Sequence, residues 1–182
     1  MSNSDQSIKS VSNTAFIFPG QGSQKVGMGR DLLDFPVSAN VFKRVDDALG
    51  RKLSDIIFNG PDDELMLTRN AQPAIMTVSI ACYEALKEKS GDLFPVPQYV
   101  AGHSLGEYTS LYVSGALDLE ETAKLVSLRG ELMQDACDQN PGTMAALIGL
   151  DEKAVYEISR QTGTYVSNIN TDLQTVISGD KA

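Results

Sequence analysis

The chain has 182 residues, of which 42% are apolar, and its formal net charge is −9 at pH 7. This length and composition are typical of a globular protein with one or two domains, and they exclude a disordered or fibrous chain. The acidic balance argues against nucleic acid or a membrane surface as a partner, and no apolar run is long enough to cross a bilayer.

The first 13 residues, "MSNSDQSIKSVSN", are polar and lack the apolar core of a targeting signal. They predict a disordered tail over residues 1–13. Cys82 and Cys137 lie far apart in helix-like sequence, so we expect both to be reduced and buried in a cytoplasmic protein. Two cysteines and a single histidine argue against a zinc site built by the protein, and no metal is expected.

A short apolar run, "TAFIFPG", predicts a buried strand that ends at Pro-Gly, and the glycine-rich loop "GQGSQKVGMG" follows it. The loop begins like a dinucleotide-binding fingerprint, but Lys25 stands where the last glycine would be. Two interpretations remain open. The loop is either a flexible connection or a source of exposed amides for one half of an oxyanion hole.

Helical patterns dominate the middle of the chain. The longest covers residues 70–89, with Pro73 in its first turn, where the missing N–H does little harm, and with Gly91 as its stop. A second buried strand is predicted over residues 97–103, and its place in an α/β pattern predicts that it lies parallel to the first strand. Asp118 and Glu121 resemble a capping box for a helix that runs from residue 119 to about 137.

The stretch "AGHSLGEY" places Ser104 between Gly102 and Gly106, where a buried strand runs into an amphipathic helix. This spacing is typical of a nucleophile held in a strained, exposed position, with the following amide at a helix N-terminus. The alternative is an ordinary turn with a capping serine. The ring of His103 should face away from the Ser104 hydroxyl and hydrogen-bond beneath the turn, so the sequence supplies no evident base.

A cation interrupts the apolar side of the helix over residues 119–137. Arg129 falls near the centre of the apolar stripe, so we expect it to face the core and to meet an anion there. That anion is either a buried Asp or Glu of the chain or the carboxylate of a substrate. The stripe consists of Leu125, Val126, Leu128, Leu132, Met133 and Ala136.

The pattern changes after residue 140, and the remainder predicts a strand, a helix and two further strands. This β-α-β-β order is the first part of a ferredoxin-like unit, which needs one more helix and strand. We therefore expect a domain over residues 14–140 and a partial second domain over residues 141–182, with an unpaired strand edge.

Four segments in the same order closely resemble bacterial malonyl-CoA:acyl carrier protein transacylases of the acyltransferase family. They are "FIFPGQGSQKVGMG", "GHSLGEY", "VSLRGELMQ" and "GTMAALIGL". The resemblance implies an α/β fold: an α/β-hydrolase-like large domain with an inserted ferredoxin-like small domain, both incomplete in this chain.

The resemblance also assigns roles. It implies that Ser104 is the nucleophile, that the amides of Gln21 and Leu105 form the oxyanion hole, that Arg129 clamps the free malonyl carboxylate, and that Met133 lines the same pocket. Supporting positions are His103, Gly102 and Gly106.

The implied activity is transfer of a malonyl group from malonyl-CoA to acyl carrier protein through a malonyl-serine, in fatty acid biosynthesis. No cofactor is implied, because coenzyme A belongs to the substrate and phosphopantetheine to the carrier. The family's catalytic histidine lies downstream of residue 182. We therefore expect a fragment, a truncated gene product or half of a split protein, with a separate C-terminal fragment as a partner. The alternatives are a serine hydrolase and a non-catalytic remnant that binds acyl-CoA or carrier.

Overall fold

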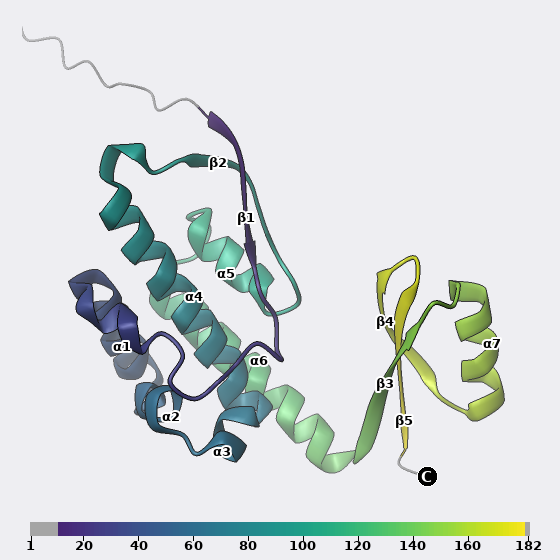
Figure 1. Cartoon of the computed structure of the whole chain (residues 1–182). Coiled ribbons are helices and arrows are strands. Elements are labelled where there is room, and N and C mark those ends of the chain that lie inside the picture. Colours follow the sequence, from purple (N-terminus) through teal and green to yellow (C-terminus); the bar gives the residue numbers. More distant parts are fainter. Residues whose placement is uncertain (1–10, 181–182) are drawn as a thin grey trace, which may run out of the picture. The chain divides into compact units, whose positions relative to one another are not determined.

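The computed structural model describes residues 11–180, and it divides into two compact units, Met1–Gln134 and Asp135–Ala182 (Figure 1). Most of the predicted polar tail lies outside the described residues. Its last three positions do not belong to a tail, because strand β1 (Val11–Phe18) begins at Val11. Val11 and Ser12 pair with Val96 and Pro97 of the neighbouring strand, which accounts for the earlier start.

The first unit contains a parallel pair of strands, β1 and β2 (Val96–Gly102), as expected (Figure 1). Phe16 lies opposite Val100, and Phe18 lies opposite Gly102. The carboxyl ends of parallel strands meet at the same edge of a sheet. The glycine-rich loop after β1 and the serine turn after β2 therefore begin side by side.

Both strands were expected to be buried, and this prediction is wrong for most of their residues. Ile17 is 77% exposed and Tyr99 is 66% exposed, whereas Phe18 is buried. Exposed side chains alternate with covered ones along β1, where Ile17 is exposed and Phe16 and Phe18 are not. The described residues therefore cover only one face of this sheet.

Helix α5 (Gly106–Val113) packs on both strands of this sheet. The predicted capping box of α6 is present: Glu121 donates its N–H to the Asp118 carboxylate at 2.7 Å, and Asp118 donates its N–H to Glu121 at 3.2 Å. No helix in the described part of the chain is both long and apolar enough to span a membrane. The helices are η1 (Arg30–Asp34), α1 (Pro36–Leu49), α2 (Leu53–Asn59), α3 (Asp62–Met66), α4 (Thr68–Ser90), η2 (Gly91–Leu93), α5 (Gly106–Val113) and α6 (Leu119–Gln139).

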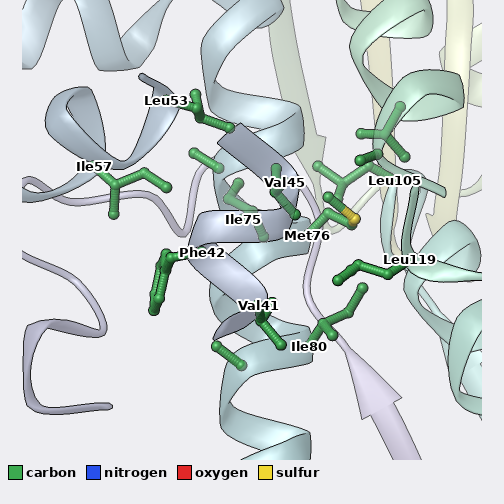
Figure 2. Close-up of a cluster of buried hydrophobic side chains, with 14 of the residues drawn as sticks. Val41, Phe42, Val45, Leu53, Ile57, Ile75, Met76, Ile80, Leu105 and Leu119 are labelled. Atoms are coloured by element: carbon green, nitrogen blue, oxygen red, sulfur yellow. The ribbon is translucent and has the colours of Figure 1, made fainter. Parts of the chain in front are cut away.

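The hydrophobic core forms around α4, whose residues 71–77 are all buried (Figure 2). Helices α1 and α2 supply Val45 and Leu53 to it, and α6 supplies Leu119. Leu105, the residue directly after the serine, is completely buried in this same cluster. Core packing therefore fixes the position of the serine turn.

The buried face of α6 differs from the predicted apolar stripe. Only Val126 of the stripe is buried, while Leu128 and Leu132 are 52% and 60% exposed. The face that packs inward carries small residues instead, because α6 approaches the backbone of α4 closely: a methyl group on Gly130 would lie 2.9 Å from the Thr68 carbonyl oxygen. The inward-facing residues are Leu119, Thr122, Ala123, Val126, Ser127 and Gly130.

Both cysteines are free thiols, as expected, but both are exposed and the prediction of burial is wrong. Cys82 follows the buried residues Ile80 and Ala81 of α4 and points to the other side of the helix. Cys137 lies in the last turns of α6, where every residue from 135 to 139 is exposed.

The second unit has the predicted β-α-β-β order: β3 (Gly142–Ile148), α7 (Glu152–Thr162), β4 (Tyr165–Thr171) and β5 (Gln174–Asp180). The strands form an antiparallel sheet in the order β3-β5-β4. Asp151 caps α7 by accepting from the Ala154 N–H at 2.8 Å. Helix α7 packs on β4 and β5 and buries Val155 and Ser159.

A half-buried tyrosine links α5 to α4 and makes the stability of the fold sensitive to alkaline pH. The Tyr112 hydroxyl donates to the Glu84 carboxylate at 2.9 Å. Burial, followed by this contact with Glu84, raises the pKa of Tyr112 above its ordinary value. Because the pKa is higher in the folded state, this contribution to stability is complete below about pH 10 and is lost as pH rises further.

We therefore expect Tyr112→Phe to have a smaller loss of stability than the wild type between neutral pH and about pH 11, measured by urea unfolding. Tyr156→Phe is the matched control, since Tyr156 is half-exposed and should leave the pH dependence unchanged. Equal alkaline losses in the wild type and Tyr112→Phe would contradict this role of Tyr112.

Candidate active site

Ser104 occupies a sharp turn between β2 and α5, and its side chain is exposed. Its φ of 54° is the only positive value at a non-glycine residue in the described part of the chain. Such a conformation costs free energy and persists only where the surroundings impose it. Here the turn is held by backbone bonds: the His103 N–H donates to the Phe18 carbonyl at 3.0 Å, and the Gly106 N–H donates to the His103 carbonyl at 2.9 Å.

Glycine is required on both sides of Ser104 because the backbone approaches itself there. A methyl group on Gly102 would lie 1.9 Å from the carbonyl carbon of Gly106. One on Gly106 would lie 2.4 Å from the Phe18 carbonyl oxygen. The G-x-S-x-G spacing therefore permits the close crossing of β1, β2 and α5 that presents the serine.

The side chain of His103 lies against the loop after β1 rather than against the serine. A methyl group on Gly20 would come within 2.7 Å of His103 Nδ1, so the imidazole packs directly on that glycine. The hydrogen bond expected beneath the turn is absent: within residues 11–180 only the backbone of His103 is hydrogen-bonded. His103 supports the turn by packing and by its backbone, and it does not contact the Ser104 hydroxyl.

Two backbone amides lie at the edge where the serine is presented. Leu105 leads into α5, and Gln21 follows β1 by three residues. Among the described residues, neither N–H donates to a protein acceptor. Two hydrogen bonds anchor the loop that carries Gln21. The side-chain amide of Gln21 donates to Thr68 Oγ1 at 3.1 Å, and Ser23 Oγ donates to the Gly20 carbonyl at 3.0 Å.

Arg129 of α6 reaches the serine directly, and its Nη2 donates to Ser104 Oγ at 2.9 Å. The guanidinium also lies over the ring of Tyr108, 5.7 Å from its centroid. In the described part of the chain Arg129 forms no ion pair with a carboxylate. The alternative of a structural pair with a buried Asp or Glu is therefore wrong, and the cation remains uncompensated beside the hydroxyl.

Gln72 of α4 is the site residue that the sequence did not single out. It is completely buried, and its Oε1 accepts a hydrogen bond from Arg129 Nη1. Its Nε2 donates to the Met133 sulfur at 3.2 Å. Met133 thus contacts Gln72, the hydrogen-bond partner of Arg129, and is itself 40% exposed. The available signal was a single polar residue inside the otherwise apolar stretch "AQPAIM" (residues 71–76).

These groups together can perform one kind of chemistry. An exposed hydroxyl on a strained turn can attack an acyl carbonyl, and free amides at the same edge can stabilise the resulting oxyanion. An unpaired arginine beside the hydroxyl favours an acyl group that carries its own negative charge. The chain is thus a mixed α/β protein in which an exposed serine has the surroundings that a nucleophile requires.

Comparison with known proteins narrows this class. Residues 15–182 match the family model described as the acyl transferase domain, and the chain belongs to that family. It is similar to the malonyl CoA-acyl carrier protein transacylase of Haemophilus influenzae, with 46% identity over 92% of this chain and 55% of the relative.

Solved structures of malonyltransferases are also similar to this chain. The acyl-carrier-protein-S-malonyltransferase of Bartonella henselae superposes with a TM-score of 0.84 at 49% identity, over 92% of this chain and 55% of that one. A malonyl-transacylase in complex with its type II polyketide acyl carrier protein gives a TM-score of 0.83 at 40% identity, over 93% of this chain and 56% of that one. The chain thus spans about half the length of the relatives that it matches.

Proposed function

We propose that this chain carries the nucleophile and carboxylate clamp of an enzyme that transfers a malonyl group from malonyl-CoA to acyl carrier protein. The observation that carries the proposal is the distance of 2.9 Å between Arg129 Nη2 and Ser104 Oγ. In a malonyl group, a single methylene separates the thioester carbonyl from the free carboxylate. A guanidinium adjacent to the nucleophile can therefore hold the carboxylate while the hydroxyl reaches the carbonyl.

The proposed reaction is a double displacement. Ser104 Oγ attacks the malonyl thioester and loses its proton to a base, and the carbon–sulfur bond breaks to release coenzyme A, whose thiolate takes up a proton. The thiol of the carrier's phosphopantetheine arm then attacks the malonyl-serine ester and regenerates the hydroxyl. The transferring chemistry uses no resident metal or cofactor.

The amides of Gln21 and Leu105 are proposed to stabilise the tetrahedral intermediate of each step. Both N–H groups lack a protein acceptor in the described residues, which supports this role. Leu105 is fixed by complete burial and the Gln21 loop by its bond to Thr68, so these donors need little reorganisation during the reaction. Gly102, Gly106 and His103 support the turn, and Met133 lines the acyl site beside Arg129.

The base is the one group that these residues do not supply. His103 is the single histidine of the sequence, and its ring packs on Gly20. The family resemblance implies that a histidine from another segment serves as the base, so we include a separate C-terminal fragment among the proposed partners.

The finer architecture is part of the same proposal. Residues 14–140 would form the first part of an α/β-hydrolase-like large domain, supported by the parallel pair β1–β2 and its serine turn. Residues 141–182 would begin an inserted ferredoxin-like domain, supported by the β3-α7-β4-β5 order. The two free thiols support a reducing compartment, and we infer a cytoplasmic enzyme.

The experiment that tests this function measures formation of the malonyl ester on Ser104. Incubated with malonyl-CoA, the 182-residue polypeptide is expected to form a malonyl ester slowly on the peptide that contains Ser104, seen by mass spectrometry. Without a base, only the oxyanion hole and substrate binding can accelerate the reaction. The rate of transfer to carrier protein should therefore exceed the uncatalysed rate in water by no more than roughly 10³–10⁴-fold.

Ser104→Ala is the control and should carry no ester. Release of free malonate without transfer would favour a serine hydrolase, and binding of malonyl-CoA without any ester would favour a non-catalytic binding protein. Fast transfer that depends on Ser104 would show that another residue of this polypeptide, not a histidine, acts as the base beside the serine.

A further inference from the structure

Gln72 lies in the core and contacts the charged group nearest to the nucleophile. We infer that Gln72 is a positioning residue that holds Arg129 in place for the acyl carboxylate while leaving its positive charge uncompensated. This inference rests on the proposed function, in which Arg129 binds that carboxylate. It adds a determinant of acyl-group selectivity that does not itself touch the substrate.

The orientation of the Gln72 amide follows from its two neighbours. Arg129 offers only donors, so the amide must turn its oxygen toward Nη1. The amide nitrogen is then directed at the Met133 sulfur, 3.2 Å away, which is a weak acceptor. Since Gln72 is completely buried, it has no water to exchange with, and this single orientation is retained.

The guanidinium is thereby fixed at two points. Nη1 is held by Gln72 and Nη2 contacts Ser104, while the ring of Tyr108 supports the planar group. An arginine that is fixed before substrate arrives loses less side-chain entropy on binding, and its planar fork matches a carboxylate. The position of Arg129 next to Ser104 therefore depends on a residue of another helix.

The chemical identity of Gln72 matters as much as its position. Within residues 11–180, the side chains that hydrogen-bond to the Arg129 guanidinium or stack on it are all uncharged in their ordinary states: Gln72, Ser104 and Tyr108. A glutamate at position 72 would have nearly the same shape and would form a buried ion pair with Arg129. The substrate carboxylate would then compete with a carboxylate of the protein, and the charge that selects malonyl over acetyl groups would be satisfied already.

The test is a competition for Ser104 between malonyl-CoA and acetyl-CoA at equal concentrations. The ratio of the two serine esters, read from the intact mass of the 182-residue polypeptide, cancels differences in folded fraction and in serine reactivity. The wild type is expected to carry mainly malonyl. In Gln72→Glu the ratio should fall roughly tenfold, the effect of one charge-assisted hydrogen bond, while the melting temperature is retained or raised by the new ion pair.

Gln72→Met provides a second variant that keeps the volume and removes the acceptor. The ratio of malonyl to acetyl ester should also fall in this variant, because Arg129 keeps its charge but loses the hydrogen bond from Nη1 to residue 72. Thr77→Val is the control, since Thr77 is buried on the same helix and bonds only to the Pro73 carbonyl, so its ratio should equal that of the wild type.

The outcomes separate the two proposals. A wild-type polypeptide that carries both esters equally overturns the proposed function and this inference with it. A wild type that selects malonyl while Gln72→Glu or Gln72→Met selects it equally well overturns the positioning role alone. A parallel loss of melting temperature and ratio in both variants, with no change in Thr77→Val, would reduce Gln72 to a packing residue and likewise overturn the inference.

Discussion

Gly102→Ala is expected to abolish the native turn at Ser104 and to destabilise the first unit severely. The added methyl group would lie 1.9 Å from the carbonyl carbon of Gly106 and 2.3 Å from the amide nitrogen of Glu107. Both atoms are backbone, so no side chain can move aside. Strand β2 and helix α5 would have to separate, and Leu105 would leave the core.

We expect a loss of more than about 4 kcal/mol, beyond the range of ordinary substitutions. Urea unfolding followed by far-UV circular dichroism measures it. Gly115→Ala is the matched control, because Gly115 has a φ of 79° with no atom within 4 Å of the added group. Gly115→Ala should lower the free energy of unfolding only by the cost of placing an alanine in a left-handed conformation, about 1–2 kcal/mol. Similar stabilities for the two variants would mean that the close crossing at Gly102 does not constrain the fold.

The serine turn was predictable because its causes are local. Two glycines between a strand and a helix form the turn, and they can be read from "AGHSLGEY" and its flanks. The contacts that anchor the turn to Phe18 and to the core cannot be read in this way. The β-α-β-β order of the second unit was predictable for the same reason, since each element has its own periodicity and its own turn residues. The burial of β1 and β2 was not predictable, because it depends on which elements cover each face of their sheet.

The prediction that Arg129 faces the core was based on an apolar stripe that the structure leaves largely exposed. The periodicity placed it at the centre of an apolar stripe that was assumed to face the core. The structure buries the small residues of α6 instead and leaves Leu128 and Leu132 exposed. Arg129 still meets a specific partner, because it lies at the margin of the buried face, beside Gln72 and Ser104.

The role of Gln72 could not be identified from the sequence because it depends on contacts with another helix, α6. The neighbours of Gln72 in the chain are apolar residues and Pro73, and a buried glutamine among them has no local partner. Its partners Arg129 and Met133 lie 57 and 61 residues away. Contacts at such separations follow from helix packing, which the pattern of apolar residues on each helix does not determine.

Arg129→Leu is expected to remove the preference for malonyl groups. In the competition between malonyl-CoA and acetyl-CoA, the ratio of the two esters on Ser104 should fall roughly 100-fold, because the carboxylate loses a two-pronged, charge-assisted partner. The acetyl ester should form as fast as before or faster. It does not use the cation, and Ser104 Oγ would no longer accept a hydrogen bond from Nη2.

Arg129→Lys should give an intermediate ratio, because an ammonium keeps the charge but cannot reach Gln72 and a carboxylate through a planar fork. Lys124→Leu is the matched control: it removes a cation from the same helix at an exposed position and should leave the ratio unchanged. If Arg129→Leu lowered both esters by the same factor, Arg129 would act on the serine rather than on the substrate. The uncompensated charge beside Ser104 would then activate the nucleophile, and acyl selectivity would have to come from residues outside α6.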